Sequence, residues 1–402
     1  MTSVVDAELG EQQFSRRTVL KLGGAAALGS PFLIGHASGA SRKSAPPVYF
    51  DRQYDVSSTN GAFPMGLAET AAGGFMIAGF RVHSSNWLVK TKPNGRWLWT
   101  RSLHHWPDGS VYPFATPRDI IPAHGSGFIA VGSSREHPQE GGKSHRGFWI
   151  QKFTDTNEHV WFRDFGHGFR VAHSVARAPD GGYVIVGSRI DSDLDENVVW
   201  LVKTDEHGHK QWTRTYHHQG SASGYKIVAL PQGGYAILAS VSDGTNESWV
   251  FKICPNGRKY WECFFDDEFT DLIPVFRGLL LFGANRSEHF HLVRLNRHGA
   301  RLWTRHVAYP GMEHSSGTLV KVHGGYVISG SLYPGSSDPT GVVARYSLGG
   351  KQRWEYTSTP LVINEIIATR DGNVAIAGHS PNENDIDTPI LIKIPSTRAL
   401  SF

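Results

Sequence analysis

The chain contains few of the residues that would tie it to a disulfide framework or to nucleic acid. Only two of its 402 residues are cysteine, Cys254 and Cys263. The formal net charge is +4, and no run of Lys and Arg occurs beyond the N-terminal region. So few cysteines exclude a disulfide-rich scaffold. The weak charge argues against nucleic acid as a partner.

Recognisable catalytic motifs are also missing. The sequence has no Ser-His-Asp arrangement, no phosphate-binding glycine loop and no Cys/His set with zinc spacing. These absences favour a binding or assembly protein over an enzyme. They leave the metal content, if any, unspecified.

Glycine-rich turns followed by an apolar segment recur along the chain. Glycine supplies the φ > 0 conformation that a tight turn before a strand requires. Seven copies occur, at Gly73-Gly74-Phe75, Ser126-Gly127-Phe128, Gly181-Gly182-Tyr183, Gly233-Gly234-Tyr235, Arg277-Gly278-Leu279, Gly324-Gly325-Tyr326 and Asp371-Gly372-Asn373. The strand after each copy ends in a base, at Lys90, Lys152, Lys203, Lys252, Arg294, Arg345 and Lys393. A period of about 50 residues with several strands per unit is typical of a β-propeller.

A tryptophan opens the last strand of each unit but occurs only six times. These residues are Trp99, Trp161, Trp212, Trp261, Trp303 and Trp354. The missing copy lies at the start of the repeats, where Phe50-Asp51-Arg52-Gln53-Tyr54 matches Trp212-Thr213-Arg214-Thr215-Tyr216. We therefore predict an all-β fold, a seven-bladed β-propeller of four-stranded antiparallel blades. The N-terminal strand would complete the last blade and close the ring, so that no sheet edge stays open there.

The first 40 residues have the features of an export signal. Ser15-Arg16-Arg17-Thr18-Val19-Leu20-Lys21 resembles the twin-arginine (Tat) signal, with Val19 in place of the usual Phe. The weakly apolar stretch from Leu22 to Gly35 is too short to span a bilayer, and Ser38-Gly39-Ala40 fits a cleavage site. The resemblance implies a signal peptide at 1–40, a short lead at 41–47 and one propeller domain at 48–402. It also implies the Tat translocase as a partner during export and a periplasmic or secreted mature protein without an integral membrane segment. We expect that protein to be a monomer.

The pattern Asp205-x-x-Gly208-x-x-x-Trp212 resembles a family motif, the tryptophan-docking motif of quinoprotein dehydrogenases and of the propeller subunit of outer-membrane protein assembly. The chain also resembles exported bacterial propeller repeats of the Asp-Gly-Gly-Tyr type. Both resemblances imply the propeller fold. Those dehydrogenases have eight blades and adjacent cysteines over their cofactor. This chain has seven units and no adjacent cysteines, so we do not expect the quinone cofactor PQQ.

Long connections that differ from blade to blade should emerge on one face of the ring, opposite the short uniform turns. Binding residues concentrate on loops carried by a rigid scaffold. We therefore expect an envelope protein or a carbohydrate to bind this variable-loop face. Candidate ligand-binding residues in these loops are Trp106, Tyr112, His105, His218 and His314.

The innermost strands should bring ionisable side chains to the mouth of a central channel. Counting eight residues back from each glycine turn gives Met65, Arg118, His173, Tyr225, Phe269, Ser316 and Asn364. The positions that follow are Gly66, Asp119, Ser174, Lys226, Thr270, Gly317 and Glu365. Ionisable groups that converge in a concave site can support acid–base chemistry. A solvated mouth with mutual ion pairs is the alternative.

If the protein is an enzyme, a polysaccharide lyase acting on uronate polymers is the sharpest hypothesis. Seven-bladed lyases of this kind resemble the chain in architecture only. Arg118 or Lys226 would neutralise the uronate carboxylate. His173 or Tyr225 would move the proton. Asp119 and Glu365 complete the expected ligand-binding ring.

Calcium stays open as a ligand. Asp191, Asp193 and Asp195 alternate as at the start of a calcium loop, although the usual glycine and the closing glutamate are absent. The two cysteines flank the hairpin of the fourth unit, several rungs apart, so we predict no disulfide between them.

Overall fold

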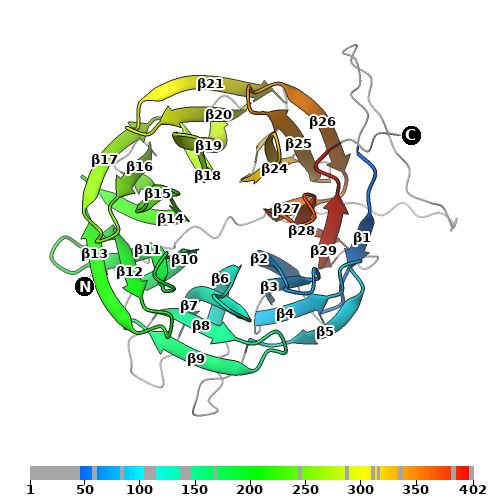
Figure 1. Cartoon of the computed structure of the whole chain (residues 1–402), viewed down its shortest axis with the longest axis horizontal. Helices are drawn as coiled ribbons and strands as arrows, with labels where there is room; N and C mark the ends of the chain where they lie inside the picture. Colours follow the sequence, from blue (N-terminus) through cyan, green and yellow to red (C-terminus); the bar gives the residue numbers. More distant parts are fainter. Residues whose placement is uncertain are drawn as a thin grey trace, which may run out of the picture. The chain divides into compact units, whose positions relative to one another are not determined.

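The computed structural model describes residues 46–56, 61–81, 86–103, 115–135, 146–166, 170–242, 247–285, 289–308, 313–314, 317–333, 338–381 and 386–397. These residues form seven antiparallel sheets arranged as blades around one axis (Figure 1). No α-helix occurs among them. The prediction of a seven-bladed propeller is confirmed.

The first three blades each run from the axis outward as four consecutive strands. Blade one comprises β2 (Ala62–Glu69), β3 (Phe75–Arg81), β4 (Asn86–Thr91) and β5 (Trp97–Arg101). Blade two comprises β6 (Ala115–Pro122), β7 (Phe128–Arg135), β8 (Arg146–Phe153) and β9 (His159–Asp164). Blade three comprises β10 (Arg170–Arg177), β11 (Tyr183–Asp191), β12 (Glu196–Thr204) and β13 (Lys210–Tyr216).

The remaining blades keep this order, with one interruption in blade six. Blade four comprises β14 (Ser221–Ala229), β15 (Tyr235–Ser242), β16 (Glu247–Ile253) and β17 (Lys259–Phe265). Blade five comprises β18 (Glu268–Val275), β19 (Gly278–Asn285), β20 (His289–Asn296) and β21 (Arg301–Ala308). Blade six has a divided inner strand, β22 (Glu313–His314) and β23 (Thr318–Val322), followed by β24 (Gly325–Tyr333), β25 (Thr340–Ser347) and β26 (Gln352–Ser358).

Blade seven contains both ends of the propeller. Its strands are β27 (Val362–Ala368), β28 (Val374–Pro381), β29 (Asp387–Ile394) and the outermost strand β1 (Phe50–Gln53). β1 pairs with β29 from Phe50↔Lys393 to Gln53↔Ile390. Just beyond the strand, the Tyr54 hydroxyl donates to Gly95 O of blade one at 2.7 Å. The predicted closure by the N-terminal strand is therefore present.

The hydrophobic core lies between adjacent blades. One cluster, for example, joins Val184 and Leu201 of blade three to Tyr235, Trp249 and Phe251 of blade four. The two central strands of each blade are apolar along both faces, because each face packs against a neighbour. One blade alone could not bury both faces, whereas a closed ring buries them all.

The repeated tryptophans dock on the next blade, as the sequence predicted. Gly208 has φ +79°, and a Cβ there would lie 2.6 Å from the Trp161 ring of the preceding blade. Gly299 stands in the same relation to Trp261, with φ +86° and a Cβ distance of 2.8 Å. Only glycine combines this backbone conformation with such close approach.

The seven-fold basic position is also architectural. Lys203 is almost fully buried, and its Nζ donates to Asp180 Oδ2 at 2.8 Å and to Gln211 Oε1 at 2.8 Å. Lys393 Nζ donates to Asp371 Oδ2 at 2.7 Å. These two bases bind the glycine turn of their own blade, whereas Lys90 Nζ of blade one donates to Asp155 O in a turn of blade two at 2.6 Å.

Both cysteines are free thiols. Cys263 lies opposite Val250 on the β16–β17 ladder, while Cys254 lies in the turn beyond Ile253. Burial raises the pKa of the Cys263 thiol to about 12, so this group is a poor nucleophile.

Candidate functional site

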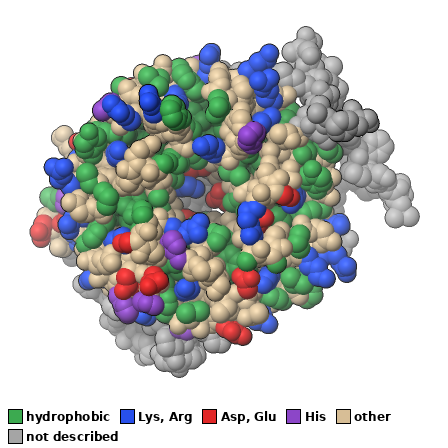
Figure 2. Space-filling model, in the orientation of Figure 1, with side chains coloured by type: hydrophobic (Ala, Val, Ile, Leu, Met, Phe, Trp, Pro, Cys, Tyr) green, Lys and Arg blue, Asp and Glu red, His purple; other side chains and the backbone are tan. Residues whose placement is uncertain are grey.

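The inner strands carry a β-bulge at the place where the sequence predicted a channel mouth. The ladder skips one residue at Met65, Arg118, His173, Tyr225, Thr270 and Asn364. A bulge turns the extra side chain out of the regular alternation. The space-filling view shows a hollow at the centre of the ring, with charged side chains around it (Figure 2).

The predicted register is wrong by one residue in blades five and six. In blade five the bulge is Thr270 rather than Phe269, and the next position is Asp271 rather than Thr270. In blade six Thr318, not Gly317, pairs with Ser329 at this level. The cause is the turn that follows the inner strand. In blade five it leaves two residues between Val275 and Gly278, whereas in blade three it leaves three between Ala178 and Gly182.

This correction brings Asp271, which sequence reasoning missed, into a charged cluster with Lys226. Lys226 Nζ lies 3.4 Å from Asp271 Oδ1, and the side chains are 27% and 4% exposed. Burial alone would lower the pKa of Lys226, but the charges of Asp271, Glu365 and Asp119 outweigh it and raise the pKa. One ammonium thus faces carboxylates from three other blades, which we call the axial cluster. Its members are Lys226, Asp119, Asp271 and Glu365.

Two carboxylates of the axial cluster also hold neighbouring blades. Asp119 Oδ2 accepts from Ser174 Oγ and from Val175 N, both at 3.0 Å. Asp271 Oδ2 accepts from Leu319 N at 2.8 Å. A charged acceptor strengthens such a bond to backbone N–H. These carboxylates therefore fasten blade two to blade three and blade five to blade six.

Glu365 is the member of the axial cluster whose pKa is raised into the neutral range. Burial raises its pKa to about 7. The positive charge of Lys226 acts against this rise, whereas Asp271 and Asp119 add to it. Burial likewise raises the pKa of Asp271, with Lys226 again opposing the shift. Glu365 is therefore the member of the axial cluster that takes up or releases a proton near neutral pH.

The predicted catalytic residues His173 and Tyr225 do meet. Their ring centroids lie 5.0 Å apart in an edge-on arrangement. Burial, helped by the positive charge of Arg118, lowers the pKa of His173 to about 3. Tyr225 remains 44% exposed. The histidine is therefore neutral at neutral pH and is a weak base.

Of the predicted ligand-binding residues in the variable loops, the structure places only the side chain of His218. Trp106, Tyr112 and His105 lie outside the described residues, and of His314 only the backbone in β22 is described. His218 packs on Phe264 of the outer strand β17, with ring centroids 4.7 Å apart. Its Nδ1 contacts Gln219 O at 2.8 Å.

The acidic loop between β11 and β12 is partly committed to protein contacts. Asp191 Oδ2 lies 3.5 Å from Arg189 Nη2 and 3.9 Å from His217 Nε2. Asp191 Oδ1 accepts from Asp193 N at 3.1 Å, and Asp195 has φ 53°. Within the described ranges, no three His, Cys, Asp or Glu side chains are grouped to hold a metal ion.

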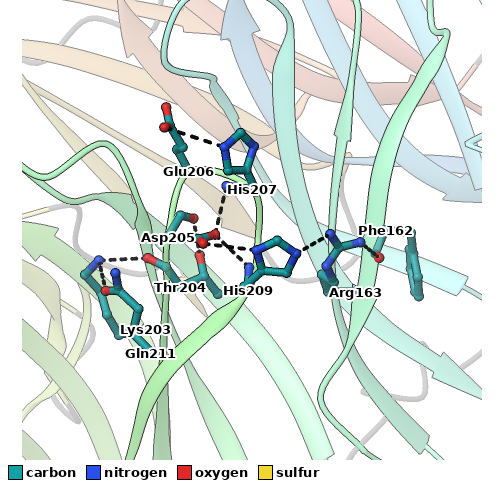
Figure 3. A network of polar contacts seen from close by, with 9 residues as sticks. All are labelled: Phe162, Arg163, Lys203, Thr204, Asp205, Glu206, His207, His209 and Gln211. Carbon is teal, nitrogen blue, oxygen red and sulfur yellow. Dashed lines mark hydrogen bonds and ion pairs between the residues drawn. The ribbon is translucent and has the colours of Figure 1, made fainter.

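A polar network joins blades two and three at the short turns (Figure 3). Asp205 Oδ1 accepts from the backbone N–H of His207 and His209, at 2.9 and 2.8 Å. The His209 ring bridges Asp205 Oδ2 and Arg163 Nη2, each 3.1 Å away. Because arginine only donates, His209 Nε2 must accept and Nδ1–H must donate to Asp205. This network is a blade-to-blade contact of the turn that the sequence motif marks.

No helix in the described part of the chain is long and apolar enough to cross a membrane.

Comparisons with known proteins support the fold and nothing more specific. No family model and no curated protein matches the chain. Among solved structures, BBS1N in complex with ARL6DN gives a TM-score of 0.54 at 11% identity, covering 90% of this chain and 99% of that one. The Dos1 propeller gives 0.53 at 11% identity, with coverage of 87% and 96%. BamB from Moraxella catarrhalis gives 0.46 at 15% identity, with coverage of 88% and 92%, a likeness too low to carry an argument.

Proposed function

We propose that the protein is a rigid binding module that holds an envelope protein or a carbohydrate on its variable-loop face. The observation that carries this proposal is the use of charge around the axis. Asp119 and Asp271 bind backbone N–H groups of the next blade, and Lys226 lies beside Asp271. Three of the ionisable groups at the axis are thus engaged in holding the frame together.

The propeller suits this role because its stability depends on the interblade cores, whereas ligand binding would depend on the variable loops. Seven interblade cores fix the strands. The connections between the second and third strands, and between blades, can then vary without loss of the core. BBS1N, a propeller of similar fold, is in complex with ARL6DN. That supports protein binding by analogy of fold alone.

The proposed place of action is the periplasm or the cell exterior. The support is Ser15–Lys21, which resembles a Tat signal, followed by an apolar stretch and small residues at a cleavage site. The Tat pathway exports folded proteins. A closed ring fits such export, because blade seven forms only when β1 and β29 pair. The Tat translocase would be a transient partner, and the mature protein a monomer.

The lyase alternative has a specific weakness at the axis. A general base works best when its pKa lies near the working pH. The pKa of His173 is lowered to about 3, which makes it a poor proton acceptor. The ring contact of His173 with Tyr225 and the pKa of Glu365, raised to about 7, favour the enzyme. Incubation with uronate polymers, followed by ultraviolet absorbance of unsaturated ends, tests it directly.

Capture from an envelope extract tests the binding proposal. Three variants change the variable-loop face: Leu194→Asp, His217→Asp and Tyr225→Asp. Trp97→Asp is the matched control, since Trp97 is 58% exposed at the opposite end of a blade and Leu194 is 53% exposed. At least one loop-face variant should lose a captured partner at least tenfold, while the control keeps it. Loss in the control alone would contradict the proposal.

A further inference from the structure

The short turns of blades four to six are basic, whereas those of blades two, three and seven contain the acidic residues. These turns join the first strand to the second and the third to the fourth in each blade, so they share one face, which we call the turn face. In blades four to six the turns are 230–234, 254–258, 275–278, 296–300, 322–325 and 347–351. They contain no Asp or Glu, and their exposed bases are Arg258, Arg277, Arg297 and Lys351.

Acidic residues occur in the turns of blades two, three and seven, at Asp155, Glu158, Asp180, Asp205, Glu206 and Asp371, where Arg370 is the base. The turns of blade one contain the bases Lys92 and Arg96 and no acid. Figure 2 shows Lys and Arg mixed with hydrophobic side chains over the upper arc of the ring. Acidic side chains gather mainly at the lower left, and a further group of Lys and Arg lies at the lower right. Folding of similar turns does not require their charges to differ between blades. This difference in charge therefore calls for another explanation.

Large apolar side chains are exposed in blades four to six as well. Phe276 is 78% exposed and Leu348 is 65% exposed, and both lie within turns. Tyr260 and Leu302, each 57% exposed, lie at the start of the outer strands. Both are bulge residues, skipped between Lys259 and Trp261 and between Arg301 and Trp303. Leu98 and Val160 occupy the same bulge position in blades one and two and are 39% and 47% exposed, so Phe276 and Leu348 are the apolar side chains that distinguish these turns. Exposed apolar side chains of this size indicate an interaction surface.

The most exposed of these side chains is firmly held. Phe276 lies in a two-residue turn with Arg277, whose φ is 57°. The Arg277 guanidinium lies 5.1 Å from the Phe276 ring centroid, and Arg294 Nη2 donates to Phe276 O. Leu348 projects similarly from the 347–351 turn, close in sequence to Lys351. Both exposed apolar side chains thus lie in turns that also contain a base, Arg277 or Lys351.

We propose that the turn face of blades four to six docks on an anionic phospholipid surface. Arg and Lys side chains would lie at the level of the lipid phosphates. Phe276 and Leu348 would enter the boundary between headgroups and acyl chains, where amphipathic surfaces gain apolar burial. The acidic turns of blades two and three would be repelled and would fix the orientation. The variable-loop face would then point away from the lipid, free for its ligand.

Two other anionic partners fit the surface less well. Nucleic acid would use aromatic side chains for base stacking, but Leu348 and Leu302 cannot stack. An acidic protein would need a surface shaped to the projecting Phe276 and Leu348, whereas a lipid interface adapts to them. The proposal does not depend on which ligand the variable-loop face holds.

Co-sedimentation with lipid vesicles tests the proposal. The full-length protein is mixed with vesicles of phosphatidylcholine alone, or with about one-third phosphatidylglycerol, at low salt. We expect binding only to the anionic vesicles. Arg277→Gln with Arg297→Gln should weaken it roughly 25-fold, about fivefold per charge. Phe276→Ser with Leu348→Ser should also weaken it by at least tenfold.

Matched variants in blade one, on the same face, serve as controls. Lys92→Gln with Arg96→Gln removes two bases of blade one, and Trp97→Ser removes an apolar side chain that is 58% exposed. Both should bind like the wild type. All variants keep residues 1–45, so that segment contributes equally to each. Unchanged unfolding midpoints would show that the substitutions act at the surface.

Three results would overturn the proposal. One is the absence of binding to anionic vesicles by folded protein. Another is an equal loss in the control and test variants. The third is retention of polyglutamate or single-stranded DNA, in parallel binding assays, by a protein that does not sediment with vesicles.

Discussion

Lys226 Nζ lies 3.4 Å from Asp271 Oδ1, so a base on the inner strand of blade four meets an acid on blade five. The other oxygen of that carboxylate accepts from Leu319 N of blade six at 2.8 Å. One side chain, only 4% exposed, therefore connects three consecutive blades. The contacts of blade five with blades four and six therefore both depend on the position of Asp271.

Replacing Asp271 with Ala should destabilise the ring. The change leaves the buried Leu319 N without its acceptor and removes the carboxylate nearest to Lys226. We expect the free energy of unfolding to fall by about 2–4 kcal/mol. Guanidinium unfolding at neutral pH measures this. Asp266→Ala, at an exposed site nearby, is the control and should change stability by less than about 0.5 kcal/mol. Equal effects of both variants would refute the axial role of Asp271.

Glu365 should make stability depend on pH in an unusual direction. Its pKa is raised from 4.5 to about 7, so between these values the folded chain keeps a proton that the unfolded chain has lost. Stability then falls as pH rises through this window. Glu365→Gln is neutral at every pH and should match the wild type near pH 4. Above pH 8 its free energy of unfolding should exceed that of the wild type by about 3 kcal/mol.

Unfolding titrations at several pH values, with Glu268→Gln as an exposed control, provide the comparison. Lys226 opposes the shift, while Asp271 and Asp119 favour it. Asp371, whose pKa is lowered to about 2 beside Lys393, loses its contribution only at more acidic pH. A difference between wild type and Glu365→Gln that stays constant from pH 5 to pH 8 would show that Glu365 titrates normally.

Export should depend on the two adjacent arginines of the signal. Arg16→Lys with Arg17→Lys should leave the full-length protein in the cytoplasm, because the Tat resemblance rests on that pair. The wild type should appear in the periplasmic or culture fraction, shortened by residues 1–40. Arg42→Lys, just beyond the expected cleavage site, should be exported normally. Mass spectrometry of the fractions decides the matter, and export of the double variant would remove the Tat proposal.

The fold was predictable because the sequence repeats its turn chemistry. The glycine turns, the strand-ending bases and the six tryptophans mark the units. Phe50–Tyr54 could be recognised as the missing outer strand because it matches Trp212–Tyr216. Such sequence matches predict structure when equivalent residues of each blade make the same packing contacts. The docking of Trp161 on Gly208 is one example of that shared solution.

The axial cluster was only partly predictable, since it depends on register. Counting back from the glycine turn located Asp119, Lys226 and Glu365 but missed Asp271. The turns at Phe276-Arg277 and at His323-Gly324 are one residue shorter than those of the other blades, which moves the inner strand by one position. Aligning the buried residues Leu272 and Ile227 would have placed Asp271 level with Lys226. The meeting of side chains across the axis is a tertiary relationship that no single repeat contains.

The account depends most on closure of the ring by the N-terminal strand, and a pair of matched substitutions tests it. The Tyr54 hydroxyl donates to Gly95 O at 2.7 Å, joining the two ends of the propeller. The Tyr216 hydroxyl makes the same bond to Gly257 O at 2.5 Å between blades three and four. If the ring is closed, Tyr54→Phe and Tyr216→Phe should each lower the free energy of unfolding by about 1–2 kcal/mol. A normal loss for Tyr216→Phe with no loss for Tyr54→Phe would show that the ends do not meet.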